Sequence, residues 1–83
     1  GTQMRESKEG DPLTEAQEKM FLYIRRRVRS GMPPTVREII HHFGMSSTNA
    51  ARQQMMAIEK KGYIERAHGI ARGTRITNRG QRL

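Results

Sequence analysis

The stretch GMPPTVREIIHHFGMSSTNAARQQM, residues 31–55, decides the fold. It contains two short helical patterns, which Gly44 and two serines separate. The second pattern opens with Asn49 and two alanines, so its first turn is narrow and polar. Small side chains let a helix end come close to another surface. We therefore expect the start of this second helix to be a contact surface.

A longer helix is expected before this stretch, from about Leu13 to Arg29. Thr14 is a suitable N-cap, and the acidic residues of the first turn match the positive end of a helix. The apolar residues recur with the i, i+3, i+4, i+7 spacing of a buried helix face. They are Met20, Phe21, Ile24 and Val28.

Within the opening stretch, Thr35 and Glu38 have the spacing of a capping box, so a helix begins after Thr35 and ends at Gly44. Its expected inner face is Ile39, Ile40 and Phe43. One hydroxyl of Ser46, Ser47 or Thr48 caps the next helix, which runs to about Lys61 before Gly62. The residues expected to face inward from that helix are Ala51, Met55 and Ile58.

The pattern then changes to two short strands, residues 63–67 and 74–77, around a loop with two glycines. The predicted fold is mainly α with a small β-hairpin: a winged helix-turn-helix of three helices and a two-stranded wing. We assign it to residues 13–77. Residues 1–12 are expected to be a disordered leader or an expression remnant, and residues 78–83 a frayed polar tail.

The charge of the chain favours nucleic acid as its partner. The net charge is +8, and residues 20–83 carry thirteen basic residues against three acidic ones. Most of the basic residues are arginines, whose planar fork suits phosphate. There is no cysteine, which excludes disulfides and thiolate metal sites, and the longest apolar run is only Met20 to Ile24. We expect no membrane contact and a cytoplasmic, nucleoid-associated protein.

A helix-turn-helix presents its second helix to a major groove about 12 Å wide. Ala50 and Ala51 would keep the leading end slim, while Asn49, Arg52 and Gln53 project from the first turns. Arginine pairs best with guanine, and glutamine with adenine. The side chains expected to contact the DNA backbone are Ser46, Thr48, Arg37, Arg72, Arg75 and His68.

Residues 13–77 resemble the N-terminal DNA-binding domain of the LexA repressor family. The resemblance rests on several short pieces in a fixed order. They are Leu13-Thr14, Ile24-Arg25, Gly31-Met32-Pro33-Pro34-Thr35, Glu38-Ile39, Gly44, Ser47, Asn49-Ala50-Ala51, Lys61-Gly62, Ile64-Glu65, Arg72-Gly73 and Arg75. It implies a winged helix-turn-helix that represses SOS genes from an operator palindrome.

The resemblance also implies that Ser47, Asn49 and Ala50 read bases. The next base-reading pair in the familiar repressor is acidic, whereas here it is Arg52 and Gln53. A glutamate accepts a hydrogen bond from cytosine and an arginine donates to guanine, so the operator sequence stays open.

The family's repressor also has a C-terminal self-cleaving domain with a Ser-Lys dyad and an Ala-Gly cleavage site. This sequence ends at Leu83 without these features, so we expect either an excised domain or a short natural protein. No enzymatic activity, cofactor or small-molecule substrate is expected. Dimerisation is expected on DNA or through the missing domain.

Other interpretations concern a few side chains. His41 and His42 are adjacent, so on a helix they point about 100° apart and are not expected to share a metal. Leu22 and Met56 stand where the familiar domain has polar residues, so both should be exposed and could form a partner patch. The alternative function is therefore a protein-interaction module that modulates a host repressor or polymerase.

Overall fold

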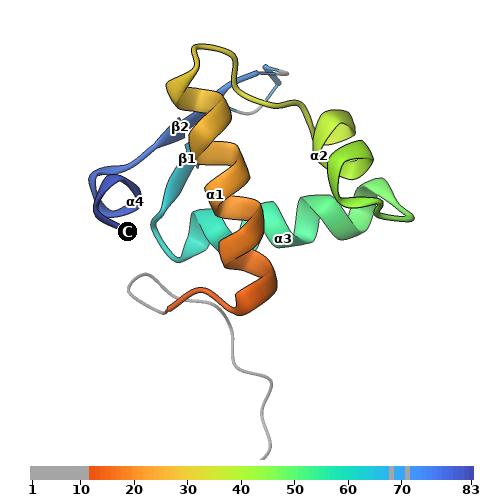
Figure 1. Ribbon diagram of the computed structural model, residues 1–83, viewed down its shortest axis with the longest axis horizontal. Coiled ribbons are helices and arrows are strands. Elements are labelled where there is room, and N and C mark those ends of the chain that lie inside the picture. The colour runs from red at the N-terminus through yellow and green to blue at the C-terminus, as the bar shows by residue number, and fades with distance from the viewer. Residues whose placement is uncertain (1–11, 68, 71) are drawn as a thin grey trace, which may run out of the picture.

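The computed structural model describes residues 12–67, 69, 70 and 72–83. Three helices come first: α1 (Glu15–Arg29), α2 (Val36–Phe43) and α3 (Thr48–Lys60). They are followed by an antiparallel hairpin of β1 (Ile64–Arg66) and β2 (Thr74–Ile76), and by a short α4 (Asn78–Arg82). Figure 1 shows α1 crossing in front of α3, with α2 on one side of it and the hairpin on the other. The predicted winged helix-turn-helix is confirmed.

Local sequence signals set the helix ends. Thr14 caps α1, and the Thr14 hydroxyl and Gln17 side chain form a reciprocal capping box. Thr35 and Glu38 form the predicted capping box of α2, and Gly44 ends that helix in the left-handed conformation at φ 64°. Glycine adopts this conformation without the steric cost that a Cβ brings. Of the three candidate hydroxyls, that of Ser47 caps α3 by accepting from the Ala50 amide at 3.1 Å.

The core lies where the three helices meet the base of the hairpin. Its buried members are Met20, Phe21, Ile24, Ile39, Ala51, Met55, Ile58, Tyr63 and Ile64. The inward face predicted for α3 is therefore correct. The prediction for Phe43 is wrong, because this residue stands at the last position of α2 and is 36% exposed. Instead of entering the core, Phe43 packs edge-on against the rings of Tyr23 and His42 at the rim between α1 and α2.

The hairpin pairs Ile64 with Ile76, Glu65 with Arg75 and Arg66 with Thr74. Its base is joined to the end of α3, since the Thr77 hydroxyl donates to the carbonyl of Gly62 at 2.5 Å. Gly62 has φ 91° and turns the chain from α3 into β1. The wing is thus fixed firmly at its base.

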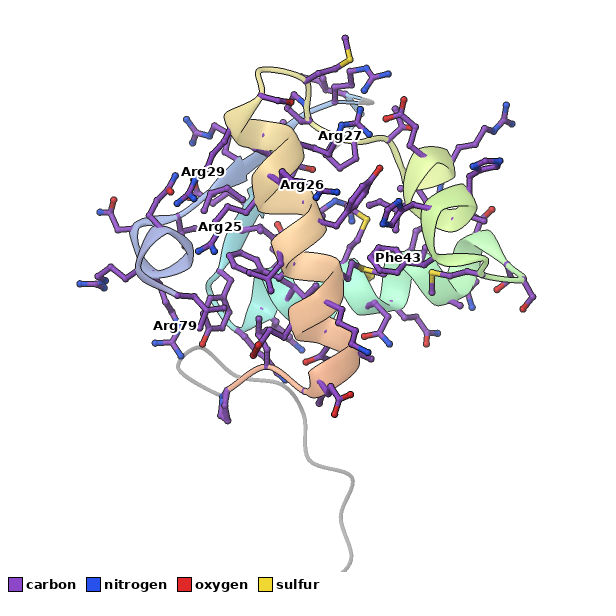
Figure 2. All side chains as sticks on the ribbon, in the orientation of Figure 1. Arg25, Arg26, Arg27, Arg29, Phe43 and Arg79 are labelled. Carbon is purple, nitrogen blue, oxygen red and sulfur yellow. The ribbon has the colours of Figure 1, made fainter. Side chains whose placement is uncertain are left out.

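The prediction of a frayed tail is wrong for residues 78–82, which form α4. Thr77 caps this helix, and the Arg25 guanidinium donates to the carbonyl of Gly80 at 3.1 Å. Arg29 donates to Gln81 at 2.8 Å, so two arginines of α1 hold the last turn of the chain. Figure 2 shows Arg25 and Arg29 on the side of α1 that faces α4, with Phe43 on the opposite side.

The expected leader lies almost wholly outside the described residues. Its last residue, Pro12, accepts a hydrogen bond from the buried Lys61 ammonium at 2.9 Å. The same ammonium donates to Gln17 at 2.6 Å, so the end of α3 is fixed to the start of α1. In the described part of the chain, no helix has the length and apolar character needed to cross a membrane.

Candidate nucleic-acid interface

The start of α3 presents a small, polar surface. Thr48 and Asn49 are exposed, whereas Ala51 is buried and holds this turn against the core. Ser47 uses its hydroxyl oxygen to cap the helix, which satisfies one of the free amides of the first turn. The remaining amides and the positive end of the helix favour a negatively charged neighbour. The predicted base-reading positions Ser47, Asn49 and Ala50 therefore lie together at one accessible end.

The outer face of α3 continues from this end with a row of exposed side chains. Arg52, Gln53, Met56 and Lys60 are all exposed. They lie opposite Met55 and Ile58, which are buried against the other helices. Arg52 and Gln53 project as the sequence predicted, because the inward-facing residues fix the rotation of the helix about its axis.

A groove of about 1260 Å³ runs beside this outer face. The first turn of α2 and the hairpin form the rest of its wall, so it brings together three segments that are distant in the sequence. Its basic lining residues are Arg37, Arg52, Lys60 and Arg66, and among the described residues the acidic one is Glu59. Glu59 accepts a hydrogen bond from the backbone amide of Arg66 at 3.3 Å, so its charge is partly compensated. The groove consequently has a net positive charge.

Apolar side chains also reach this groove. Met56 is 58% exposed and Ile70, in the wing loop, is 63% exposed, and both line it. Leu22 is exposed as predicted, but it stands on α1, which does not line the groove. The exposure predicted for Leu22 and Met56 is therefore confirmed. A shared partner patch remains a prediction.

Apart from Arg72, the predicted contacts with the DNA backbone divide into three groups. Arg37, Ser46 and Thr48 are exposed near the groove or the start of α3. Arg75 is exposed on β2 and forms an ion pair with Glu65 at 3.0 Å. His68 lies outside the described residues.

Arg72 is already engaged within the protein. Its guanidinium donates to both carboxylate oxygens of Glu38, at 2.9 and 3.0 Å, and to the carbonyl of Pro33 at 2.7 Å. The sequence identified Glu38 as a helix cap and Arg72 as a wing residue, but it gave no sign that they meet. Lys60 and Arg66 were also missed, although both belong to the basic excess noted in the sequence.

The chain was also compared with known proteins. Residues 10–73 match the family model described as LexA DNA binding domain. The LexA repressor of Colwellia psychrerythraea is 44% identical over 66 residues, which cover 78% of this chain and 31% of that protein. The LexA repressor of Burkholderia cenocepacia is 48% identical over 65 residues, covering 77% and 30% respectively. This chain therefore spans less than a third of the length of these relatives.

Proposed function

Because the chain belongs to the family of LexA DNA-binding domains, we propose that it binds double-stranded DNA sequence-specifically and acts in transcriptional repression. The observation that carries the proposal is the basic groove beside the exposed face of α3. Arginine and lysine neutralise phosphates, and a helix with a slim leading end fits the major groove. A role at a promoter also implies a place in the cytoplasm, on the nucleoid.

In the proposed complex, the first turns of α3 enter the major groove. Asn49, Arg52 and Gln53 contact base edges there, with Ser47 and Ala50 beside them. The DNA backbone beside the major groove lies in the basic groove of the protein, between α3 and the hairpin. There Arg37, Lys60 and Arg66 neutralise its phosphates. Ser46, Thr48 and Arg75 add backbone contacts at the edges, and His68 is a further candidate in the wing loop.

Arg52 sets the expected base preference. A bidentate arginine pairs with O6 and N7 of guanine, so a guanine is expected at the position that Arg52 reaches. A dimer bound to two half-sites would block a promoter. Dimerisation is proposed to occur on the DNA or through a further domain like that of the longer relatives.

Selection of bound sites from a random duplex pool tests the proposal directly. We expect an enriched palindrome with guanine at a fixed position in each half-site. A pool that stays random after several rounds, under conditions where the protein is folded, would contradict sequence-specific binding. That result would favour the alternative of a protein-interaction module, for which the exposed Leu22 on α1 is the supporting observation.

A further inference from the structure

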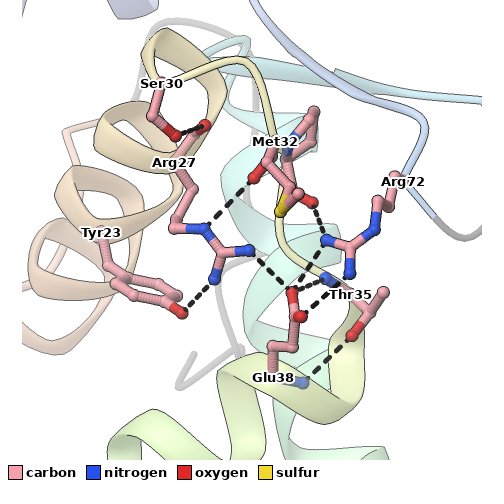
Figure 3. A network of polar contacts seen from close by, with 8 residues as sticks. Tyr23, Arg27, Ser30, Met32, Thr35, Glu38 and Arg72 are labelled. Atoms are coloured by element: carbon pink, nitrogen blue, oxygen red, sulfur yellow. Dashed lines mark hydrogen bonds and ion pairs between the residues drawn. The ribbon is translucent and has the colours of Figure 1, made fainter.

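One carboxylate connects three parts of the molecule. Oε1 of Glu38 accepts from Arg27 of α1 at 3.0 Å, from Arg72 of the wing at 3.0 Å and from the backbone amide of Thr35 at 3.1 Å. Its Oε2 accepts from Arg72 at 2.9 Å. Figure 3 shows the carboxylate between the two guanidinium groups. We call Glu38, Arg27 and Arg72 the carboxylate clamp.

Both arginines also hold the link between α1 and α2. Arg72 donates to the carbonyl of Pro33 at 2.7 Å, and Arg27 donates to the carbonyl of Met32 at 3.2 Å. Arg27 is itself oriented by the hydroxyl of Tyr23 at 2.8 Å. The clamp therefore fixes the wing loop against the same short link that leads into the capping box of α2.

The far end of the wing needs such an attachment. Each strand has three residues, and an isolated two-stranded hairpin of this size is marginally stable in water. Of the described loop residues 67, 69, 70, 72 and 73, Arg72 is the one with a polar side chain. Through its contacts with Glu38 and Pro33, the side chain of Arg72 therefore holds this part of the loop to the helices.

The clamp differs from an ordinary surface ion pair. The side chains of Arg72 and Glu38 are 41% and 35% exposed, whereas those of Arg75 and Glu65 are 78% and 62% exposed. The Arg72 contact is also bidentate, which constrains the orientation of both groups. Solvent-exposed ion pairs with a single contact contribute little to stability. The pair of Glu65 and Arg75 therefore offers a matched comparison within the same hairpin.

We propose that Glu38 is a positioning residue for DNA binding, which holds the wing at the angle that forms the basic groove, and that Arg72 acts through Glu38 instead of on phosphate. This inference rests on the proposed function, and it explains how the protein maintains the surface that binds DNA. It predicts the direction in which DNA affinity changes when Glu38 is replaced. Replacing Glu38 by Gln removes a negative charge and would strengthen DNA binding on electrostatic grounds alone, whereas loss of the clamp weakens it.

The test uses the full 83-residue chain and the duplex enriched by the wild type from a random pool. Gln is also favoured at the third position of a capping box, so Glu38→Gln leaves α2 capped. We expect this variant to bind the selected duplex roughly 5- to 20-fold more weakly, within the range of coupling in side-chain networks. Glu65→Gln makes the same charge change outside the clamp, and its affinity should stay equal or rise.

Variants of Arg72 distinguish a direct contact with phosphate from the contact with the carboxylate of Glu38. Lysine keeps the charge that a phosphate contact needs but lacks the fork that grips a carboxylate. We expect Arg72→Lys to bind as weakly as Arg72→Ala. We also expect Arg72→Ala to cost much less in the Glu38→Gln background than in the wild type. Full affinity of Arg72→Lys, or additive losses in the double variant, would overturn the proposal and make Arg72 a phosphate contact.

A readout without DNA distinguishes a failure of the clamp from a failure of the proposed function. Amide exchange and NMR relaxation at Gly69 and Gly73 should show a looser wing in Glu38→Gln, while urea unfolding still reports a folded domain. An unchanged wing would overturn the clamp. If no duplex is enriched but the wing loosens, the proposed function fails and the positioning role of Glu38 within the fold stands.

Discussion

Asn49 lies in the first turn of α3, two residues after the capping Ser47, and its side chain is exposed. We expect Asn49→Ala to weaken binding to the selected duplex by roughly 1–3 kcal/mol, the size of one lost base contact. Binding to a random duplex should change little. Fluorescence anisotropy with both duplexes measures the difference, and Asn78→Ala on α4 is the control. Equal losses on the two duplexes would make Asn49 a phosphate contact.

Arg52 is expected to determine which base is read. Its side chain is exposed on α3 and lines the basic groove. Replacing Arg52 by Glu exchanges a donor for guanine with an acceptor for cytosine, so the selected consensus should change at one position of each half-site. Arg26→Glu on α1 reverses the same charge outside the groove lining and should lower affinity without changing the consensus. An unchanged consensus in both variants would exclude base reading by Arg52.

The exposure of Asn49 and Arg52 could be predicted because it depends on sequence signals close to them. The glycine that ends α2 and the serine that caps α3 fix where α3 begins, and its inward face fixes how it is rotated, so Asn49 and Arg52 are exposed. The pairing of Glu38 with Arg72 could not be predicted. These residues are 34 positions apart in the sequence, and their contact depends on where the hairpin packs.

Among the elements, α4 shows how a tertiary contact overrides a weak local signal. Residues 78–83 are polar and include a glycine, which suggests fraying. Yet Gly80 is buried against the hairpin, where an added Cβ would collide with the carbonyl of Tyr63 and lie 2.7 Å from Ile76. We expect Gly80→Ala to destabilise the domain by about 1–3 kcal/mol, as overpacking does. Urea unfolding measures this, with Asn78→Ala as the exposed control; equal stability would show that α4 is not docked.

The clamp between α1, α2 and the wing should make stability depend on pH. Hydrogen bonds from Arg72 and from the Thr35 amide lower the pKa of Glu38 from 4.5 to about 2. A depressed pKa in the folded state stabilises the fold at pH values above the unfolded pKa, and this contribution is lost as the pH falls toward the folded pKa. The excess stability of wild type over Glu38→Gln should therefore be constant above about pH 5 and shrink between pH 4.5 and 2. Urea unfolding of both chains at several pH values checks this, and a constant difference throughout would show that the arginines do not hold the carboxylate.

At the scale of the whole molecule, the basic groove is a property of no single element. It requires α2, α3 and the hairpin in one arrangement, and the residues that create that arrangement differ from those proposed to contact DNA. The charge excess and the order of elements were enough to predict a basic surface on the helices and the wing. The sequence could not show which basic residues face the groove and which hold α4 or the wing, because arginines in both roles look alike in sequence.

Assembly is the last property to predict at this scale. The chain has a net charge of +8, and like charge opposes self-association of so small a domain. We expect a monomer at micromolar concentration, which binds one half-site weakly and two adjacent half-sites more tightly. Fusion to a dimerising coiled coil should raise affinity for the two half-sites by about 10²- to 10⁴-fold if the linker spans them. Analytical ultracentrifugation without DNA decides the first point. A stable dimer would contradict it, and loss of that dimer in Leu22→Glu or Met56→Glu would then identify these exposed side chains as its interface.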